Sequence, residues 1–141
     1  GTALNGQQYE QVASAGARFA VSPGFTREIA SASLGSAVPL LPGSTTASEI
    51  MRAIELGYTL LKFFPAEQAG GAAFLKSLAS PFGGVSFCPT GGVSVSNAKD
   101  YLSLPNVLCV GGSWVAPKAA VEAGDRTTIE TLAKEASQLK V

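Results

Sequence analysis

The chain has 141 residues, of which 46% are apolar and 14% charged, a composition typical of one folded domain rather than a disordered segment. Ten basic residues balance ten acidic ones, so the charge gives no reason to expect a nucleic acid or an anionic membrane as a partner. Histidine is absent, which excludes Ser-His and Cys-His nucleophile pairs and the commonest zinc sites.

Five short apolar runs predict β-strands, and each is followed by a turn that contains proline or glycine. In chain order the predicted strands are residues 18–22, 37–41, 59–64, 84–88 and 107–110. Their spacing of about 20 residues leaves room for one helix between successive strands.

Helical patterns fill these intervals and the two ends of the chain. Asn5 is a good N-cap for the first of them, and Ile50 and Ile54 lie at helical spacing in the third. The predicted helices are residues 6–14, 26–33, 46–56, 72–78 and 97–102, followed in the tail 116–139 by a short helix, a break at Gly124 and a longer helix.

Alternating strands and helices predict an α/β domain, residues 1–141, with a parallel sheet covered by helices. Two architectures fit this pattern, a doubly wound open sheet and a (β/α)8 TIM barrel. Both place functional residues at the carboxyl ends of the strands. The dinucleotide fingerprint G-x-G-x-x-G is absent, and two late Gly-Gly turns favour the barrel, whose phosphate site commonly follows its last strands.

Lys62 is placed in the middle of a run, TLLKFF, that otherwise has the character of a buried strand. Because side chains alternate along a strand, Lys62 and Phe64 share one face, and Leu61 and Phe63 share the other. Burial lowers the pKa of a lysine, and a neutral amine can attack a carbonyl and form a Schiff base. The residues alone leave a second interpretation open, a lysine whose amine reaches water at the strand end.

Two Gly-Gly turns follow consecutive predicted strands, Gly91-Gly92 and Gly111-Gly112 with Ser113. Without side chains, such turns allow backbone N–H groups to approach an anion closely. Two of them together favour a phosphate site over simple tight turns. The two cysteines, Cys88 and Cys109, lie in apolar runs, so we expect buried reduced thiols in a cytoplasmic protein rather than a disulfide.

Several segments, taken together and in order, resemble one family. They are GTALN (1–5), SPG (22–24), LKFFPAE (61–67), FCPTGG (87–92) and VLCVGGSW (107–114). The family is that of 2-keto-3-deoxy-6-phosphogluconate (KDPG) and 4-hydroxy-2-oxoglutarate (KHG) aldolases. The resemblance implies a class I aldolase, a lyase of the Entner–Doudoroff pathway, on a (β/α)8 barrel. It also implies a homotrimer and no metal or organic cofactor.

The resemblance also implies roles for individual residues. Lys62 matches the Schiff-base lysine. The residues that match the pyruvate pocket are Thr2 and Thr90 near the carboxylate and Pro23 and Phe64 as walls. The residues that match the phosphate end are Gly91, Gly92, Gly112 and Ser113.

Members of the family carry about three further strand–helix steps before the Gly-Thr motif. That region holds a proton-shuttling glutamate and a carboxylate-binding arginine, and no residue of this chain matches either. We expect an incomplete chain that holds the C-terminal five or so units of the barrel, or else a partner that supplies the rest. Glu67 is a tempting substitute base, but a carboxylate at a helix N-terminus is the simpler interpretation.

The sequence is therefore consistent with three functional hypotheses. The first is a class I aldolase that cleaves KDPG to pyruvate and glyceraldehyde 3-phosphate, and KHG to pyruvate and glyoxylate. The second is a phosphosugar isomerase or epimerase on the same barrel, without an imine. The third is a non-catalytic assembly piece, and whether this chain alone is active stays open.

Overall fold

Short parallel strands alternate with helices throughout residues 2–139, the part of the chain that this computed structural model describes. The strands are β1 (Ala20–Val21), β2 (Leu40–Leu41), β3 (Gly43–Ser44), β4 (Leu60–Phe63) and β5 (Ser86–Pro89). All pairings are parallel, β1 with β2, β3 with β4, and β4 with β5. Spatial order follows chain order without reversal, which favours a barrel over a doubly wound sheet.

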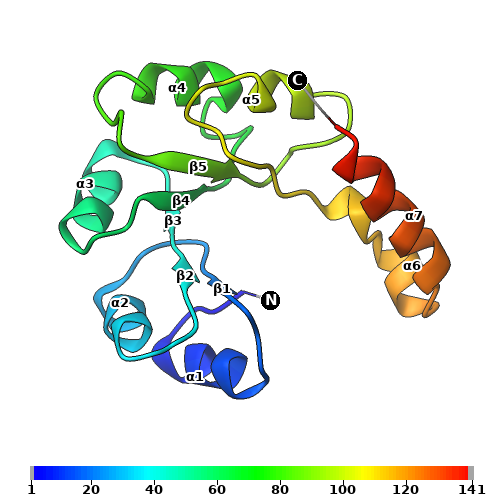
Figure 1. Ribbon diagram of the computed structural model, residues 1–141, viewed down its shortest axis with the longest axis horizontal. Helices are drawn as coiled ribbons and strands as arrows, with labels where there is room; N and C mark the ends of the chain where they lie inside the picture. The colour runs from blue at the N-terminus through cyan, green and yellow to red at the C-terminus, as the bar shows by residue number, and fades with distance from the viewer. Residues whose placement is uncertain (1, 140–141) are drawn as a thin grey trace.

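Helices follow the strands close to the predicted positions, and Figure 1 shows α1 to α5 on the outer side of a curved row of strands. Asn5 caps α1 by accepting a hydrogen bond from the Gln8 N–H, as its sequence position predicts. Among the described residues, none of the helices combines the length and the apolar character needed to cross a bilayer. The helices are α1 (Gly6–Ser14), α2 (Arg27–Leu34), α3 (Ala47–Glu55), α4 (Gly71–Leu78), α5 (Ala98–Leu102), α6 (Lys118–Glu122) and α7 (Arg126–Ser137), with the 3-10 helix η1 (Ser113–Val115).

The second predicted strand is shorter than expected and is followed closely by an unpredicted one. Pro42 separates β2 from β3, because proline has no N–H with which to continue the ladder. Its carbonyl still accepts a hydrogen bond from the Lys62 N–H at 2.8 Å. The two small sheets are therefore successive parts of one parallel array.

The predicted fifth strand, residues 107–110, is wrong as a regular strand. The segment does run parallel to β5, with bridges from Phe87 to Val107 and from Thr90 to Gly111. Between these bridges β5 advances three residues (87 to 90) while its neighbour advances four (107 to 111). The extra residue is the mark of a β-bulge, which interrupts the ladder.

The face of the sheet that packs on the helices holds the core. Leu61 and Phe63 of β4 are fully buried there, as alternation predicts. The Phe63 ring stacks on Phe74 of α4 at 5.8 Å and meets Phe87 of β5 edge-on at 6.4 Å. The opposite, inner face is left for Lys62.

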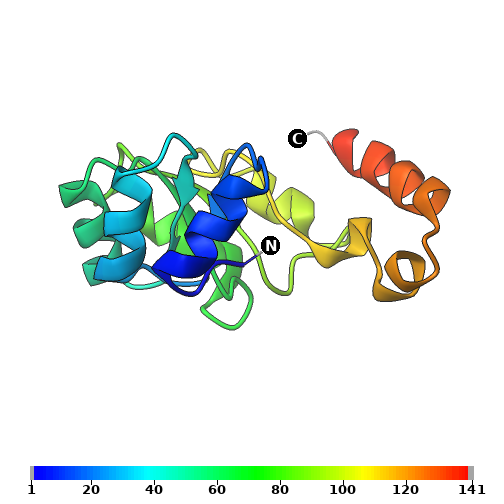
Figure 2. The same cartoon turned by 90° about the horizontal axis from the view of Figure 1, so that it is seen from below.

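The last two helices contribute little to this core. Figures 1 and 2 show α6 and α7 extending away from the strands. The described part of α7 has no buried residue, and it contacts mainly η1 and α6. Trp114 of η1 is only partly buried against the core.

Candidate active site

Lys62 lies at the centre of the inner face, flanked by a strand on each side. In the ladder it is opposite Gly43 of β3 and Cys88 of β5. Its side chain is largely enclosed, with 6% of the residue exposed. The Nζ atom lies 4.2 Å from the centroid of the Phe64 ring, so the lysine and this aromatic share a face as predicted.

The Lys62 amine is held without a carboxylate partner. Within residues 2–139 the only ion pair joins Lys118 and Glu122, on the surface of α6. Burial lowers the pKa of Lys62 below its ordinary value, and the nearby Cys88 thiol partly opposes this effect. A larger fraction of the amine is therefore neutral and nucleophilic than in an exposed lysine.

Pro23 approaches the lysine strand through Gly43. A β-carbon at position 43 would lie 2.3 Å from the carbonyl carbon and oxygen of Pro23, a distance that no side chain tolerates. The missing side chain lets the turn after β1 lie against β3, directly beside the position of Lys62. Pro23 is thus brought towards Lys62, although it is distant in sequence.

Phe64, Thr90 and Gly91 meet at the carboxyl end of β4. A β-carbon on Gly91 would lie 3.1 Å from the Phe64 ring, and the Thr90 N–H donates to the Phe63 carbonyl at 2.9 Å. The Thr90 hydroxyl lies 4.0 Å from the Cys88 sulfur. These residues and Lys62 form the floor and one wall of the site.

The two Gly-Gly turns lie side by side beyond Thr90. Gly111 forms a parallel bridge with Thr90 and donates its N–H to the Pro89 carbonyl at 2.9 Å. Across residues 2–139, the N–H groups of residues 92, 93, 112 and 113 form no hydrogen bond to the protein. Free backbone donors at the ends of neighbouring strands are suited to an anion such as phosphate.

Thr2 and Ser113 lie at the margins of this group. Thr2 bridges Val21 in parallel, which places it beside β1, on the far side of the array from β5. Ser113 begins η1 and is exposed. The structure therefore gathers Lys62, Phe64, Thr90 and Gly91 closely, and leaves Thr2 the most distant of the predicted pocket residues.

Cys88 and Cys109 form a thiol pair that sequence analysis did not anticipate. Both are free, but only Cys88 is buried, so the expectation of two buried thiols is wrong for Cys109. The two thiols interact, and their hydrogen bond raises the pKa of Cys88 and lowers that of Cys109 to about 7. Aligning the strand ends could have identified Cys88 as a neighbour of Lys62, but not the bulge.

The Glu67 carboxylate lies beside the start of α4, as the simpler interpretation predicts, because a β-carbon on Gly71 would lie 3.6 Å from its Oε1. It does not cap α4, whose N-cap is Gly70 with no side-chain hydrogen bond. Its carboxylate instead accepts a hydrogen bond from the hydroxyl of Tyr101, a buried residue of α5. Nothing in the sequence signals this contact, because the two residues lie on different elements.

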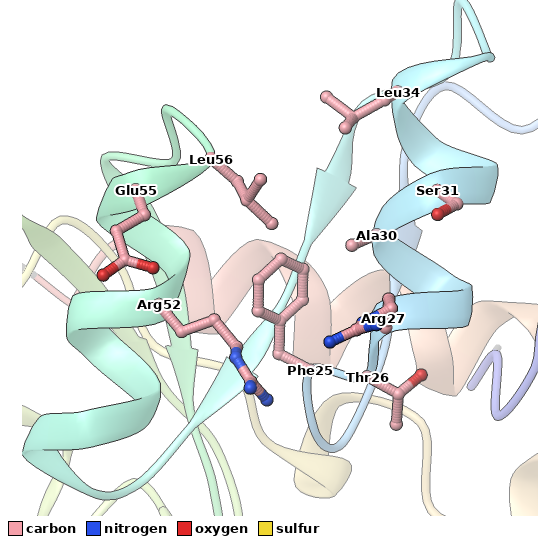
Figure 3. Close-up of a pocket in the computed structure, with 9 residues that line it drawn as sticks. All are labelled: Phe25, Thr26, Arg27, Ala30, Ser31, Leu34, Arg52, Glu55 and Leu56. Carbon is pink, nitrogen blue, oxygen red and sulfur yellow. The ribbon is translucent and has the colours of Figure 1, made fainter.

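A separate pocket of about 320 Å³ lies between α2 and α3. Figure 3 shows the Phe25 ring between the two helices, with Arg27 on one side and Arg52 and Glu55 on the other. The pocket opens in the helical layer, whereas Lys62 belongs to the opposite face of the sheet. It therefore has no part in the site described above.

Comparison with known proteins decides the family. The family model for KDPG and KHG aldolase matches residues 1–132. This chain belongs to that family. The 2-dehydro-3-deoxy-phosphogluconate aldolase of Pseudoalteromonas atlantica is 52% identical over 136 residues, which cover 96% of this chain and 63% of that protein. This chain thus spans less than two thirds of the length of that curated relative.

Solved structures of KDPG aldolases have the same fold. The Legionella pneumophila enzyme, with pyruvate captured at low pH as a covalent carbinolamine intermediate, matches 94% of this chain and 64% of its own, with 45% identity and a TM-score of 0.89. The Zymomonas mobilis enzyme, solved with 3-phosphoglycerate, matches 97% of this chain and 64% of its own, with 46% identity and a TM-score of 0.88. This member of the KDPG and KHG aldolase family therefore has the fold of KDPG aldolases over nearly all of its length.

Proposed function

We propose that this chain carries the imine-forming half of a class I aldolase, with Lys62 as the nucleophile. The observation that carries the proposal is the enclosed amine of Lys62, which has a lowered pKa and no carboxylate partner within residues 2–139. The carbinolamine of pyruvate in the Legionella relative supports it, because that species is the first product of an amine and a ketone.

The reaction follows from the chemistry of a neutral amine. The Lys62 Nζ attacks the C2 ketone of the substrate, and loss of water leaves an iminium ion. This cation accepts the electron pair of the C3–C4 bond, while a base removes the proton of the C4 hydroxyl and the aldehyde leaves. Protonation of the enamine and addition of water then release pyruvate and restore the amine.

We infer KDPG as the main substrate, cleaved to pyruvate and glyceraldehyde 3-phosphate. The free N–H groups of residues 92, 93, 112 and 113 support a phosphate at the far end of the substrate, with the Ser113 hydroxyl as a further donor. Thr2, Pro23, Phe64 and Thr90 would enclose the pyruvyl part. KHG, which has no phosphate, would use the same lysine and release glyoxylate.

We further propose that the chain forms the C-terminal five or so units of a (β/α)8 barrel and that the active assembly is a homotrimer. The strand order supports the first point, because the hydrogen-bonded pairs, β1 with β2, β3 with β4 and β4 with β5, all join strands that are consecutive in the chain, as in a barrel. No residue of this chain is assigned the role of the proton shuttle or of the carboxylate-binding cation. Glu67 is given a different role, because its carboxylate accepts a hydrogen bond from the buried Tyr101.

Borohydride reduction in the presence of pyruvate tests the proposal. Trapping should leave a carboxyethyl adduct on Lys62, identified by peptide mass mapping, and Lys62→Met should abolish it. Lys76→Met is the matched control, because Lys76 is an exposed lysine of α4. An adduct at another lysine, or isomerase turnover without any adduct, would exclude the aldolase.

A further inference from the structure

The turn that follows β4 is attached to the Gly91-Gly92 turn by a short backbone ladder. The Ala66 N–H donates to the Thr90 carbonyl at 2.9 Å, and the Glu67 N–H donates to the Gly91 carbonyl at 3.1 Å. The strand that carries Lys62 and the glycine turn are thus joined at Glu67.

The side chain of Glu67 packs directly against Gly92. A β-carbon on Gly92 would lie 2.5 Å from the Cγ of Glu67 and 2.7 Å from its Cβ, so the stem of Glu67 occupies that space. Gly91 and Gly92 both have positive φ, 95° and 78°, a conformation that strongly favours glycine. The Glu67 stem therefore lies against the backbone whose N–H groups are free.

Tyr101 holds the other end of Glu67. The residue is 1% exposed, and its hydroxyl donates to the Glu67 carboxylate. Burial and this carboxylate raise the pKa of Tyr101, so the hydroxyl remains a donor across the neutral range. The same helix region also holds the turn through Asn97, whose amide donates to the Gly92 carbonyl at 3.1 Å.

We propose that Glu67 and Tyr101 form a positioning pair, which holds the Gly91-Gly92 turn in the conformation that binds the phosphate of the substrate. The inference rests on the proposed function, since it assigns a support to the phosphate end of that site. Neither residue contacts the reacting carbons. Their loss should therefore weaken recognition of phosphate while imine formation at Lys62 continues.

Titration of the chain with inorganic phosphate, followed through the amide resonances of Gly91 and Gly92, tests the pair directly. Tyr101→Phe should weaken phosphate binding about tenfold, the effect expected for loss of a hydrogen bond to a charged group. Glu67→Gln keeps both the side-chain stem and an oxygen that accepts the Tyr101 hydrogen bond. Its affinity for phosphate should therefore stay within about twofold of that of the parent. Tyr9→Phe is the matched control, because Tyr9 is equally buried but donates to Val38.

Kinetics in the active assembly give the second measurement. Tyr101→Phe should raise KM for KDPG about tenfold with little change in kcat, and leave KM for KHG unchanged. The inference would be overturned if phosphate caused no shift of the Gly91 and Gly92 amide resonances in the parent. It would also be overturned if Tyr101→Phe raised KM equally for KDPG and KHG. The phosphate titration needs no imine, so a failure of pyruvate trapping at Lys62 would count against the proposed function alone.

Discussion

Gly43 of β3 lies directly opposite Lys62 of β4, and it is in contact with the backbone of Pro23. The absence of a side chain at position 43 lets three segments converge beside one amine. The strand ends alone would bring Lys62 near Cys88 and Gly43, but the approach of Pro23 needs the glycine. The geometry of the lysine site therefore depends on a residue that has no reactive group.

Replacement of this glycine should be severe. In Gly43→Ala the new β-carbon would collide with the Pro23 backbone at 2.3 Å, and backbone atoms cannot move aside as a flexible side chain can. We expect unfolding free energy to fall by about 3 kcal/mol or more, measured by urea denaturation. Gly24→Ala is the control, because a β-carbon there meets nothing within 4 Å. Equal stability of the two variants would contradict the close approach.

Removal of the buried amine should stabilise the fold in a pH-dependent way. The unfolded chain has an ordinary lysine with a pKa near 10.4, and burial lowers the pKa of Lys62 in the folded state. Between these two values the unfolded state binds more protons, so the parent gains stability as the pH rises. Lys62→Met should therefore exceed the parent in stability most at pH values below the folded pKa of Lys62, where the buried amine is charged.

The difference should shrink as the pH approaches 10, and urea midpoints at several pH values measure it. Lys76→Met is the control, because Lys76 is exposed and its replacement should change stability by less than about 0.5 kcal/mol at every pH. If the difference in unfolding free energy between Lys62→Met and the parent stays constant with pH, then burial of the charged amine does not destabilise the folded state.

Structural features that depend on a single helix or strand are predicted correctly from the sequence. The cap at Asn5 is local, and the alternation of Lys62 and Phe63 between faces follows from the geometry of one strand. The parallel order of the strands also followed from their regular spacing. These features need no knowledge of what packs against the segment.

Structural features that depend on how two elements pack together are not predicted from the sequence. The bulge after Val107 depends on how that segment aligns with β5, and so does the exposure of Cys109. The hydrogen bond between Glu67 and Tyr101 spans 34 residues and has no spacing rule that could predict it. Register and side-chain pairing between elements are fixed by packing, which a single sequence does not display.

The capping box at the start of α3 should make stability depend on acid. The Glu49 carboxylate accepts from the Thr45 and Thr46 N–H groups, each at 2.8 Å. Burial opposes its charge, but these bonds prevail and lower the pKa of Glu49. The contribution of Glu49 to stability is therefore fully present above the unfolded-state pKa of glutamate, near 4.3. It is lost as the pH falls through the folded-state pKa of Glu49.

Glu49→Gln should cost about 1 kcal/mol at pH 7 and show a smaller loss of stability between pH 5 and pH 3 than the parent. Urea denaturation at these pH values provides the measurement. Glu55→Gln, an exposed residue at the other end of the same helix, is the control and should be neutral or slightly stabilising. Identical behaviour of the two variants would show that the capping box contributes nothing.

The thiol pair beside Lys62 should show unequal reactivity. Cys109 is exposed and its pKa is lowered to about 7 by the hydrogen bond from Cys88, whereas Cys88 is buried with a raised pKa. Because the thiolate is the reactive form, iodoacetamide at pH 7 should modify Cys109 much faster than Cys88. Peptide mass mapping over time distinguishes the two positions.

The dependence on pH identifies the cause of this difference. In the parent the alkylation rate of Cys109 should reach half its maximum near pH 7. Cys88→Ala removes the donor, so the midpoint should move up towards the ordinary thiol value of roughly 8.5. Thr90→Val, which alters a neighbour of Cys88 but leaves both thiols, should keep the midpoint near that of the parent. A midpoint in Cys88→Ala unchanged from the parent would mean that Cys109 owes its acidity to something other than its partner thiol.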